Sequence, residues 1–201
     1  DQLVTFLGNQ DTGRFLAGAG ASPARLRLAF GLLTTMRGMP QIYAGDEVAM
    51  PGSSSNNRHD FPGGFPGDTN DAFTAAGRTP EQEAMHAWVQ GLLALRAHHA
   101  ALQSGAQQDL LADETGFVFA RIEAPESDKP STASTQREIV LVLVNKSSSP
   151  RTFHLDFSRT ALDGANALTP LWNANEQVTV NQNKCDVSVG PEQLIVFAVQ
   201  K

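Results

Sequence analysis

The sequence is short of cysteine, because Cys185 is the only one among 201 residues. A single cysteine can form no internal disulfide and offers no spacing typical of a zinc site, so the cysteine count fits a periplasmic or a cytoplasmic location equally. Long hydrophobic runs are also missing, and the first residues lack a basic start and a small-residue cleavage site. We therefore expect no membrane-spanning segment, no signal peptide and no membrane partner.

Positive charge is scarce as well. Lys and Arg together number 15 against 21 Asp and Glu, which gives a formal net charge of −6. No run of Lys and Arg occurs, so the sequence lacks the electrostatic footprint on which nucleic-acid binding depends. The apolar fraction of 41% is ordinary for a chain that buries a core, and the length suits one large domain or two small ones.

Near the start, a short hydrophobic run ends in a turn that carries one carboxylate, Asp11. Residues 5–7 (TFL) are typical of a buried strand, and residues 8–13 (GNQDTG) are poor strand formers. In an α/β barrel, the point where a strand gives way to a loop is where catalytic groups project. The plainer alternative is that Asp11 is only a turn residue, whose carboxylate bonds backbone groups two positions on.

A strand-helix-strand unit follows from the next segments. Ser22 can cap a helix whose first position is Pro23, and apolar residues recur at helical spacing as far as Met36. The apolar run 41–45 (QIYAG) then predicts a second strand, which Gly45 ends. Such a unit implies a right-handed crossover between parallel strands, and two parallel strands alone need cover and further neighbours.

Residues 51–78 are rich in Gly, Pro, Asn and Ser and show no sustained period, so they predict a long loop. Its aromatic residues favour an ordered loop that packs and recognises a ligand. A surface excursion whose phenylalanines merely pack against the body of the protein is an equal alternative. The residues concerned are Phe61, Phe65 and Phe73, with Arg58 and Asp60.

A second helix begins at the capping box 79–82 (TPEQ) and continues into the segment that contains two adjacent histidines. His86, His98 and His99 would suit a metal, but no carboxylate or further histidine lies at ligand spacing on the same face. We expect solvated histidines near the negative end of the helix dipole instead, and no metal or cofactor.

From about residue 105, short strands separated by turns predict an antiparallel β-sandwich. The segment 123–138, rich in Ser, Thr, Pro and charge, predicts a mobile hairpin loop. Carboxylates in this half are scattered at turns and form no catalytic set. The expected strands are 116–122, 138–145, 151–157, 167–172, 176–181, 186–189 and 193–199.

Three motifs in register resemble the α-amylase superfamily of glycoside hydrolases. Residues 6–11 (FLGNQD) resemble its fourth conserved region, in which a hydrophobic strand ends in Asn-His-Asp. Residues 38–50 (GMPQIYAGDEVAM) resemble its eighth barrel strand, and residues 56–68 with 70–79 resemble a loop of the neopullulanase and cyclomaltodextrinase branch. The resemblance implies the C-terminal strands and helices of a (β/α)8 TIM barrel over 1–104, followed by an antiparallel β-sandwich domain over 105–201.

By this resemblance, Asp11 is the catalytic Asp that ends the seventh strand, where it grips sugar hydroxyls and helps distort the ring towards the transition state. Asn9, Gln10 and Arg14 are assigned to substrate binding beside it, with Asn9 supporting the loop and Arg14 its acidic neighbours. Where the family usually has His, this sequence has Gln10, which can donate a hydrogen bond but cannot become cationic.

Arg58 and Asp60 are assigned to the substrate-binding rim in the same way, with a mutual ion pair as the alternative. The nucleophile and the acid of such an enzyme lie ~5 Å apart, and in the family they belong to earlier barrel strands. We expect the chain to be the C-terminal portion of a retaining hydrolase, with an α-glucan oligosaccharide and the N-terminal remainder of the barrel as partners. A non-catalytic carbohydrate-binding or interaction module is the alternative.

Overall fold

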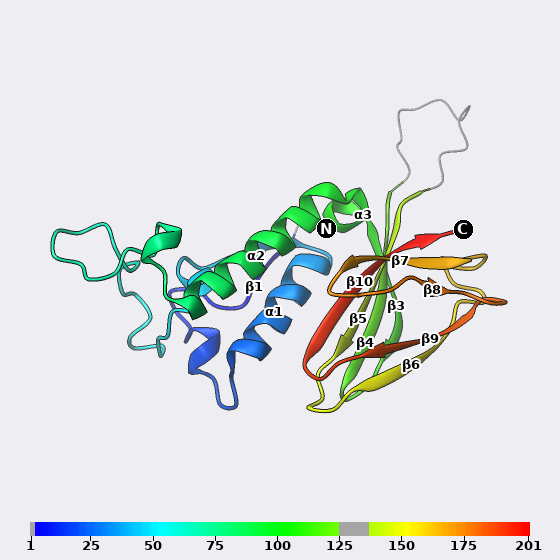
Figure 1. The fold of residues 1–201 in the computed structure, drawn as a ribbon, viewed down its shortest axis with the longest axis horizontal. Helices are drawn as coiled ribbons and strands as arrows, with labels where there is room; N and C mark the ends of the chain where they lie inside the picture. Colours follow the sequence, from blue (N-terminus) through cyan, green and yellow to red (C-terminus); the bar gives the residue numbers. More distant parts are fainter. Residues whose placement is uncertain (1–2, 125–136) are drawn as a thin grey trace, which may run out of the picture. The chain divides into compact units, whose positions relative to one another are not determined.

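The computed structural model describes residues 3–124 and 137–201 (Figure 1). Most of the hairpin loop expected at 123–138 therefore lies outside the described residues. The chain divides into two compact units, of which the first comprises residues 3–34 and 38–94 and the second residues 35–37 and 95–201.

The first unit contains a parallel pair of short strands, β1 (Val4–Phe6) and β2 (Met39–Gln41), joined through helix α1 (Pro23–Thr35). Val4 lies opposite Met39, which confirms the expected parallel crossover. The second strand comes earlier than predicted, because Gly45 has a φ of 98° and residues 46–48 form the 3-10 helix η2 (Asp46–Val48). The chain thus turns within the run that was expected to extend.

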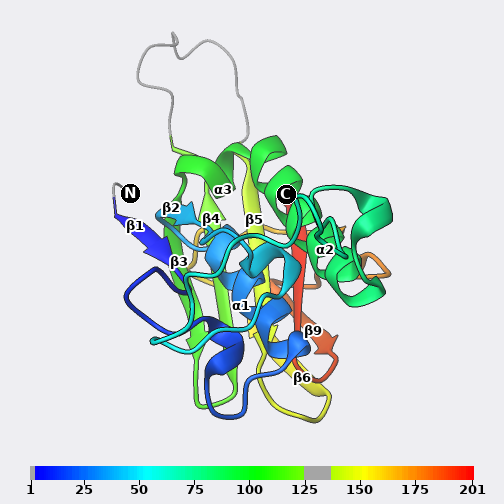
Figure 2. The ribbon, with the colours of Figure 1, turned by 90° about the vertical axis from the view of Figure 1, so that its left-hand side faces the viewer.

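Figure 2 shows β1 and β2 beside each other. Phe6 is 46% exposed and Met39 60% exposed, so the prediction of a buried first strand is wrong for the described residues. Parallel strands are normally covered on both faces, since their apolar side chains point both ways. The β1–β2 pair therefore presents a surface that further structure would cover.

The two helix starts follow the local sequence signals. The Ser22 hydroxyl accepts a hydrogen bond from the Arg25 backbone N–H at 3.2 Å. At helix α2 (Pro80–His98), the Thr79 hydroxyl accepts from the Gln82 N–H at 3.2 Å, and the Gln82 side chain accepts from the Thr79 N–H at 2.9 Å. The predicted capping box is confirmed. The helix ends one residue before His99, and a short helix α3 (Ala100–Ser104) follows.

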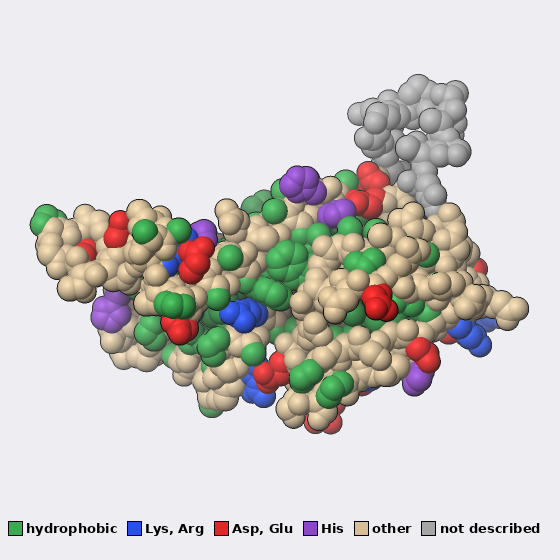
Figure 3. All heavy atoms as spheres, in the orientation of Figure 1, with side chains coloured by type: hydrophobic (Ala, Val, Ile, Leu, Met, Phe, Trp, Pro, Cys, Tyr) green, Lys and Arg blue, Asp and Glu red, His purple; other side chains and the backbone are tan. Residues whose placement is uncertain are grey.

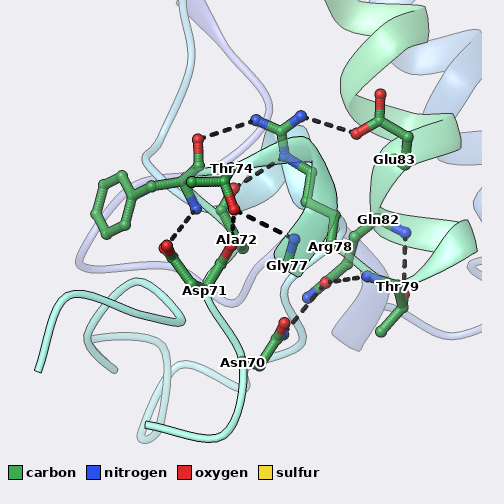
Figure 4. Close-up of polar contacts among 10 residues, drawn as sticks. Asn70, Asp71, Ala72, Thr74, Gly77, Arg78, Thr79, Gln82 and Glu83 are labelled. Carbon is green, nitrogen blue, oxygen red and sulfur yellow. Dashed lines mark hydrogen bonds and ion pairs between the residues drawn. The ribbon is translucent and has the colours of Figure 1, made fainter. Parts of the chain in front are cut away.

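Residues 51–78 form the predicted loop, whose only regular element is the 3-10 helix η3 (Ala75–Gly77). Arg78 fixes its end, because its guanidinium donates to the Ala72 carbonyl at 2.9 Å and to Glu83 at 2.8 Å (Figure 4). Phe61 and Phe73 pack with ring centroids 4.5 Å apart. Hydrophobic side chains nevertheless lie on the surface of this loop, at the left of Figure 3.

The second unit is built from antiparallel strands. A six-stranded sheet has the order β3-β4-β5-β10-β7-β8, and β6 pairs separately with β9. Side chains from both sheets enter one hydrophobic cluster, among them Leu141, Phe153 and Val187. The bounds are β3 (Ala106–Ala112), β4 (Gly116–Ile122), β5 (Ile139–Asn145), β6 (Arg151–Asp156), β7 (Ala167–Trp172), β8 (Val178–Thr179), β9 (Lys184–Val189) and β10 (Gln193–Gln200).

Every strand expected in this half is found, although β8 is much shorter than its predicted range. Strand β3 was not predicted, because its sequence AQQDLLA has no β-branched or aromatic residue and no clear alternation. These residues form a strand because they pair with β4, so tertiary context overrides their weak intrinsic preference for extended structure.

A buried arginine ties three segments of the second unit together. Arg121 is 1% exposed and donates to the carbonyls of Thr35 at 2.7 Å and Gly105 at 2.9 Å. Thr35 is the last residue of α1, where unpaired carbonyls concentrate negative partial charge. Burial lowers the pKa of Arg121 to about 10, which still leaves it charged at neutral pH.

Candidate functional site

The turn after β1 is organised by Asn9. Its side-chain oxygen accepts a hydrogen bond from the Asp11 backbone N–H at 2.8 Å, and its own N–H donates to the Thr12 hydroxyl at 3.1 Å. This is the local side-chain-to-backbone bonding typical of a turn-forming Asn. Asn9, rather than Asp11, therefore acts as the turn residue.

The carboxylate of Asp11 is left to make other contacts. Its Oδ1 accepts from Arg58 Nη2 at 3.1 Å, and its Oδ2 accepts from Gln10 Nε2 at 3.1 Å. About two-thirds of the Asp11 side chain is exposed. An ionised carboxylate has about four acceptor positions, so both oxygens remain able to accept further hydroxyl groups.

Arg58 brings the long loop to this turn. Its Nε donates to the Gln10 carbonyl at 3.1 Å, in addition to its contact with Asp11. The alternative expected for Arg58, an ion pair with Asp60, does not form. Asp60 is exposed and has no polar partner among residues 3–124 and 137–201, so its contact with substrate stays a prediction.

Asn57, the neighbour of Arg58, lies beneath the same turn. It is 1% exposed, and its amide nitrogen donates to the carbonyls of Asn9, at 2.9 Å, and of Thr12. These two carbonyls flank Asp11 in the chain. Sequence reasoning missed Asn57, because a buried Asn inside a loop of Gly, Ser and Asn has no periodic or spacing signal.

Arg14 lies at the base of the site rather than on its surface, with a side chain that is 2% exposed. It forms an ion pair with Asp46 at 2.7 Å, donates to the Ala44 carbonyl at 2.9 Å, and lies 4.4 Å from the centroid of the Tyr43 ring. Almost all of this side chain is engaged by protein groups. The ion pair with Asp46 agrees with the supporting role expected for Arg14 towards its acidic neighbours, and its contact with substrate stays a prediction.

The Asp46 carboxylate in this pair is itself buried. Burial raises the pKa of Asp46, although the hydrogen bond and charge of Arg14 oppose that shift. The Asp46 carboxylate is 4% exposed and lies 2.7 Å from the guanidinium of Arg14, so its role is to form this ion pair. Asp46 thus belongs to the framework that connects the Asp11 turn to the segment after β2.

A cavity of about 400 Å³ lies beside the turn, lined by Gly13, Arg14, Ala17, Gly18, Ser53 and Ser54. Asp11 is not part of its lining. Within the described ranges, the Asp11 side chain is 68% exposed.

Metal binding and membrane insertion have no support in the part of the chain that the structure describes. No group of three or more His, Cys, Asp or Glu side chains there could hold a metal ion. His99 instead pairs with Glu138 at 2.5 Å, and that carboxylate also accepts from the first turn of α3. No helix in residues 3–124 and 137–201 is long and apolar enough to cross a membrane.

The site thus presents the exposed carboxylate of Asp11 between the Gln10 amide and the Arg58 guanidinium, and the buried Asn57 bonds the backbone of the turn that carries it. Such groups recognise hydroxyls through charge-assisted hydrogen bonds. The arrangement contains one exposed carboxylate in place, whereas cleavage of a glycosidic bond requires two.

Comparison with known proteins gives this geometry a context. The chain is 24% identical to a cyclomaltodextrinase of Geobacillus thermopakistaniensis, covering 100% of this chain and 29% of that protein. It is also 24% identical to a maltogenic α-amylase of Bacillus acidopullulyticus, covering 98% of this chain and 30% of that one. Among solved structures, the α-amylase of Geobacillus thermoleovorans, complexed with acarbose, superposes with a TM-score of 0.74 at 22% identity, over 100% of this chain and 39% of that one.

The chain spans between 14% and 30% of the length of the curated relatives it matches. The structures it resembles are (β/α)8 barrel proteins, and the described residues contain no closed barrel. The family of α-amylase catalytic domains matches residues 1–105, which is more than half of the sequence. The chain therefore belongs to the α-amylase catalytic-domain family of glycoside hydrolases, and its relatives include cyclomaltodextrinase and maltogenic α-amylase.

Proposed function

We propose that this chain supplies the seventh and eighth strands of a (β/α)8 barrel and a C-terminal β-sandwich to a retaining α-glucan hydrolase. Residues 1–104 form the barrel part, and residues 105–201 form the sandwich. The parallel pair β1–β2, joined through α1, supports the first assignment, and the family match ends at residue 105. The hydrophobic cluster shared by the two antiparallel sheets supports the second.

The observation that carries the proposal is the Asp11 carboxylate. It stands just after a parallel strand, is two-thirds exposed, and makes its hydrogen bonds to the side chains of Arg58 and Gln10. A carboxylate in this position is suited to grip two sugar hydroxyls and to hold them more tightly as the ring distorts. Interactions that strengthen in the transition state raise kcat.

The substrates we propose are starch-derived oligosaccharides, cyclodextrins or pullulan, as the names of the relatives suggest. Retaining cleavage needs a carboxylate nucleophile and a protonated acid ~5 Å apart on opposite sides of the bond. We assign both groups to the portion of the relatives that this chain does not span. On that basis the 201-residue chain alone should be inactive.

Gln10, Arg58 and Asp60 complete the proposed rim. Gln10 and Arg58 already hold the two oxygens of Asp11, so they set its orientation and can share a bound hydroxyl with it. Since Gln10 stands where His is usual in the family, any contribution that needs a cation at that position falls to the guanidinium of Arg58.

The test compares two purified proteins, the 201-residue chain and a complete polypeptide that contains it together with the rest of the barrel. Reducing-sugar release from cyclodextrin, pullulan and soluble starch is measured for both. We expect release by the complete polypeptide only. Release by the chain alone would contradict the proposal, and so would binding of maltooligosaccharide without hydrolysis by the complete polypeptide. That second result would favour a carbohydrate-binding module instead.

A further inference from the structure

Two backbone carbonyls in the turn that carries Asp11 point at a single buried side chain. Asn57 donates to the carbonyl of Asn9, two residues before Asp11, and to that of Thr12, one residue after it. One amide group thus fixes both sides of the segment that presents the carboxylate. The position needs two hydrogen-bond donors on one atom, which only an Asn or Gln amide supplies in so short a reach.

Asn57 is itself held from the other side. Its backbone carbonyl accepts from Arg14 Nη2 at 3.2 Å and from the Tyr43 hydroxyl at 3.3 Å. Arg14 in turn is fixed by its ion pair with Asp46. A continuous series of buried and half-buried contacts therefore runs from the segment after β2, through Asn57, to the Asp11 turn.

The next residue in the chain acts on the turn's exposed side. Arg58 contacts the Asp11 carboxylate and the Gln10 carbonyl, so its approach depends on where Asn57 holds the backbone. Asn57 thus bonds the backbone of the turn on its buried side, and Arg58 bonds it on its exposed side. A displacement at Asn57 would move both Asp11 and the guanidinium that orients it.

We propose that Asn57 is a positioning residue for the reaction: it sets the Asp11 carboxylate and the Arg58 guanidinium in their working geometry without touching the substrate. This inference rests on the proposed function. Its physical basis is that misplacing a reacting group by about 1 Å can cost on the order of a hundredfold in rate. Asn57 therefore governs the rate of the folded enzyme as well as its stability.

The experiment is a double-mutant cycle in the complete polypeptide, with kcat and KM measured on a maltooligosaccharide well below the melting temperature. We expect Asn57→Ala to lower kcat/KM by roughly tenfold to a hundredfold, mainly through kcat. In an Asp11→Asn background the same substitution should cost less than about threefold, because the group that it positions is already disabled. The exposed neighbour offers a matched control, and Asn56→Ala should stay within about twofold of the wild type.

If Asn57 has a purely structural role, Asn57→Ala should lower the melting temperature while kcat and KM of the folded protein stay near the wild-type values. Alternatively, the loss of kcat/KM caused by Asn57→Ala could be the same with and without Asp11→Asn, which would show that the two residues act independently. Either result overturns the inference. If Asn57→Ala does not fold, the cycle is run with Asn57→Ser, and failure of both variants to fold would likewise overturn it. An inactive wild type, or an Asp11→Asn variant with unchanged kinetics, would refute the proposed function itself and this inference with it.

Discussion

Replacing Asp11 by Asn keeps the shape of the side chain and removes its charge. The structure sets the expected effect on stability. Among the residues that the structure describes, the polar partners of the carboxylate are Arg58 and Gln10, and the Asp11 and Arg58 side chains are 68% and 67% exposed. An ion pair this exposed contributes ~0–1 kcal/mol. For a chain of this size, the melting temperature should fall by no more than about 2 to 4 °C.

The expected effect on catalysis is far larger. If Asp11 binds the distorted sugar more strongly than the ground-state sugar, kcat and kcat/KM of the complete enzyme should fall together by roughly two or more orders of magnitude. That loss corresponds to about 2.7 kcal/mol or more of transition-state stabilisation. The backbone of the turn should survive, because its own bonds come from Asn9 and Asn57.

The assay measures kcat and KM on a maltooligosaccharide, with a melting curve for each protein. Glu114→Gln is the matched control, since it removes one exposed carboxylate from a turn of the second unit and should leave both constants unchanged. A fall of less than about threefold for Asp11→Asn would refute the reasoning and return Asp11 to the role of an ordinary turn residue.

Three further predictions concern stability and are read from melting curves. Asp46→Asn leaves the buried charge of Arg14 without its partner, which typically costs ~3–5 kcal/mol of folding stability. The melting temperature should therefore fall by roughly 6 to 20 °C. A fall under about 2 °C would contradict this prediction. Arg121→Met keeps an apolar side chain but removes the hydrogen-bond donor of two buried carbonyls, so we expect folding stability to fall by about 2 kcal/mol or more. An unchanged melting curve would show that these carbonyls find other partners. Hydrogen bonds from Arg151 and from the backbone hold the pKa of Asp113 below its ordinary value, so this carboxylate stabilises the fold fully above about pH 4 and loses that effect as the pH falls further. The melting temperatures of wild type and Asp113→Asn should therefore differ at pH 7, and the difference should shrink progressively as the pH falls below about 4 towards the lowered pKa of Asp113. A difference that stays constant over that acid range would count against the pair.

Local signals predicted the helices well. Ser22 and the capping box at Thr79 act within one turn of helix, so neighbouring residues in the sequence are enough to reveal them. The strands at 116–122 and 167–172 were predicted for the same reason, since turn residues and β-branched or aromatic side chains mark them locally. The division at 104/105 remains a prediction.

The errors came from contacts between distant residues. Arg14 was expected to support acidic neighbours, but its partner Asp46 lies 32 positions away, so the sequence alone could not identify it. Asn57 carries no signal of its own, because its role exists only once the loop folds back over the Asp11 turn. Strand β3 likewise depends on β4 for its existence. Sequence patterns report a residue's neighbours along the chain, whereas these roles are set by neighbours across space.

The short segment 35–37, which begins with the last residue of α1, has a consequence for how relatives of this chain can exchange parts in evolution. Its backbone is bonded by Arg121, by Arg96 and by the side chain of Gln107, all from the second unit. A recombination event that replaced everything after residue 104 would keep Arg96 but would have to bring equivalents of Gln107 and Arg121 for a tripeptide encoded far upstream. The C-terminal part is thus not freely interchangeable between relatives, and compatible swaps should be those that preserve an arginine at position 121.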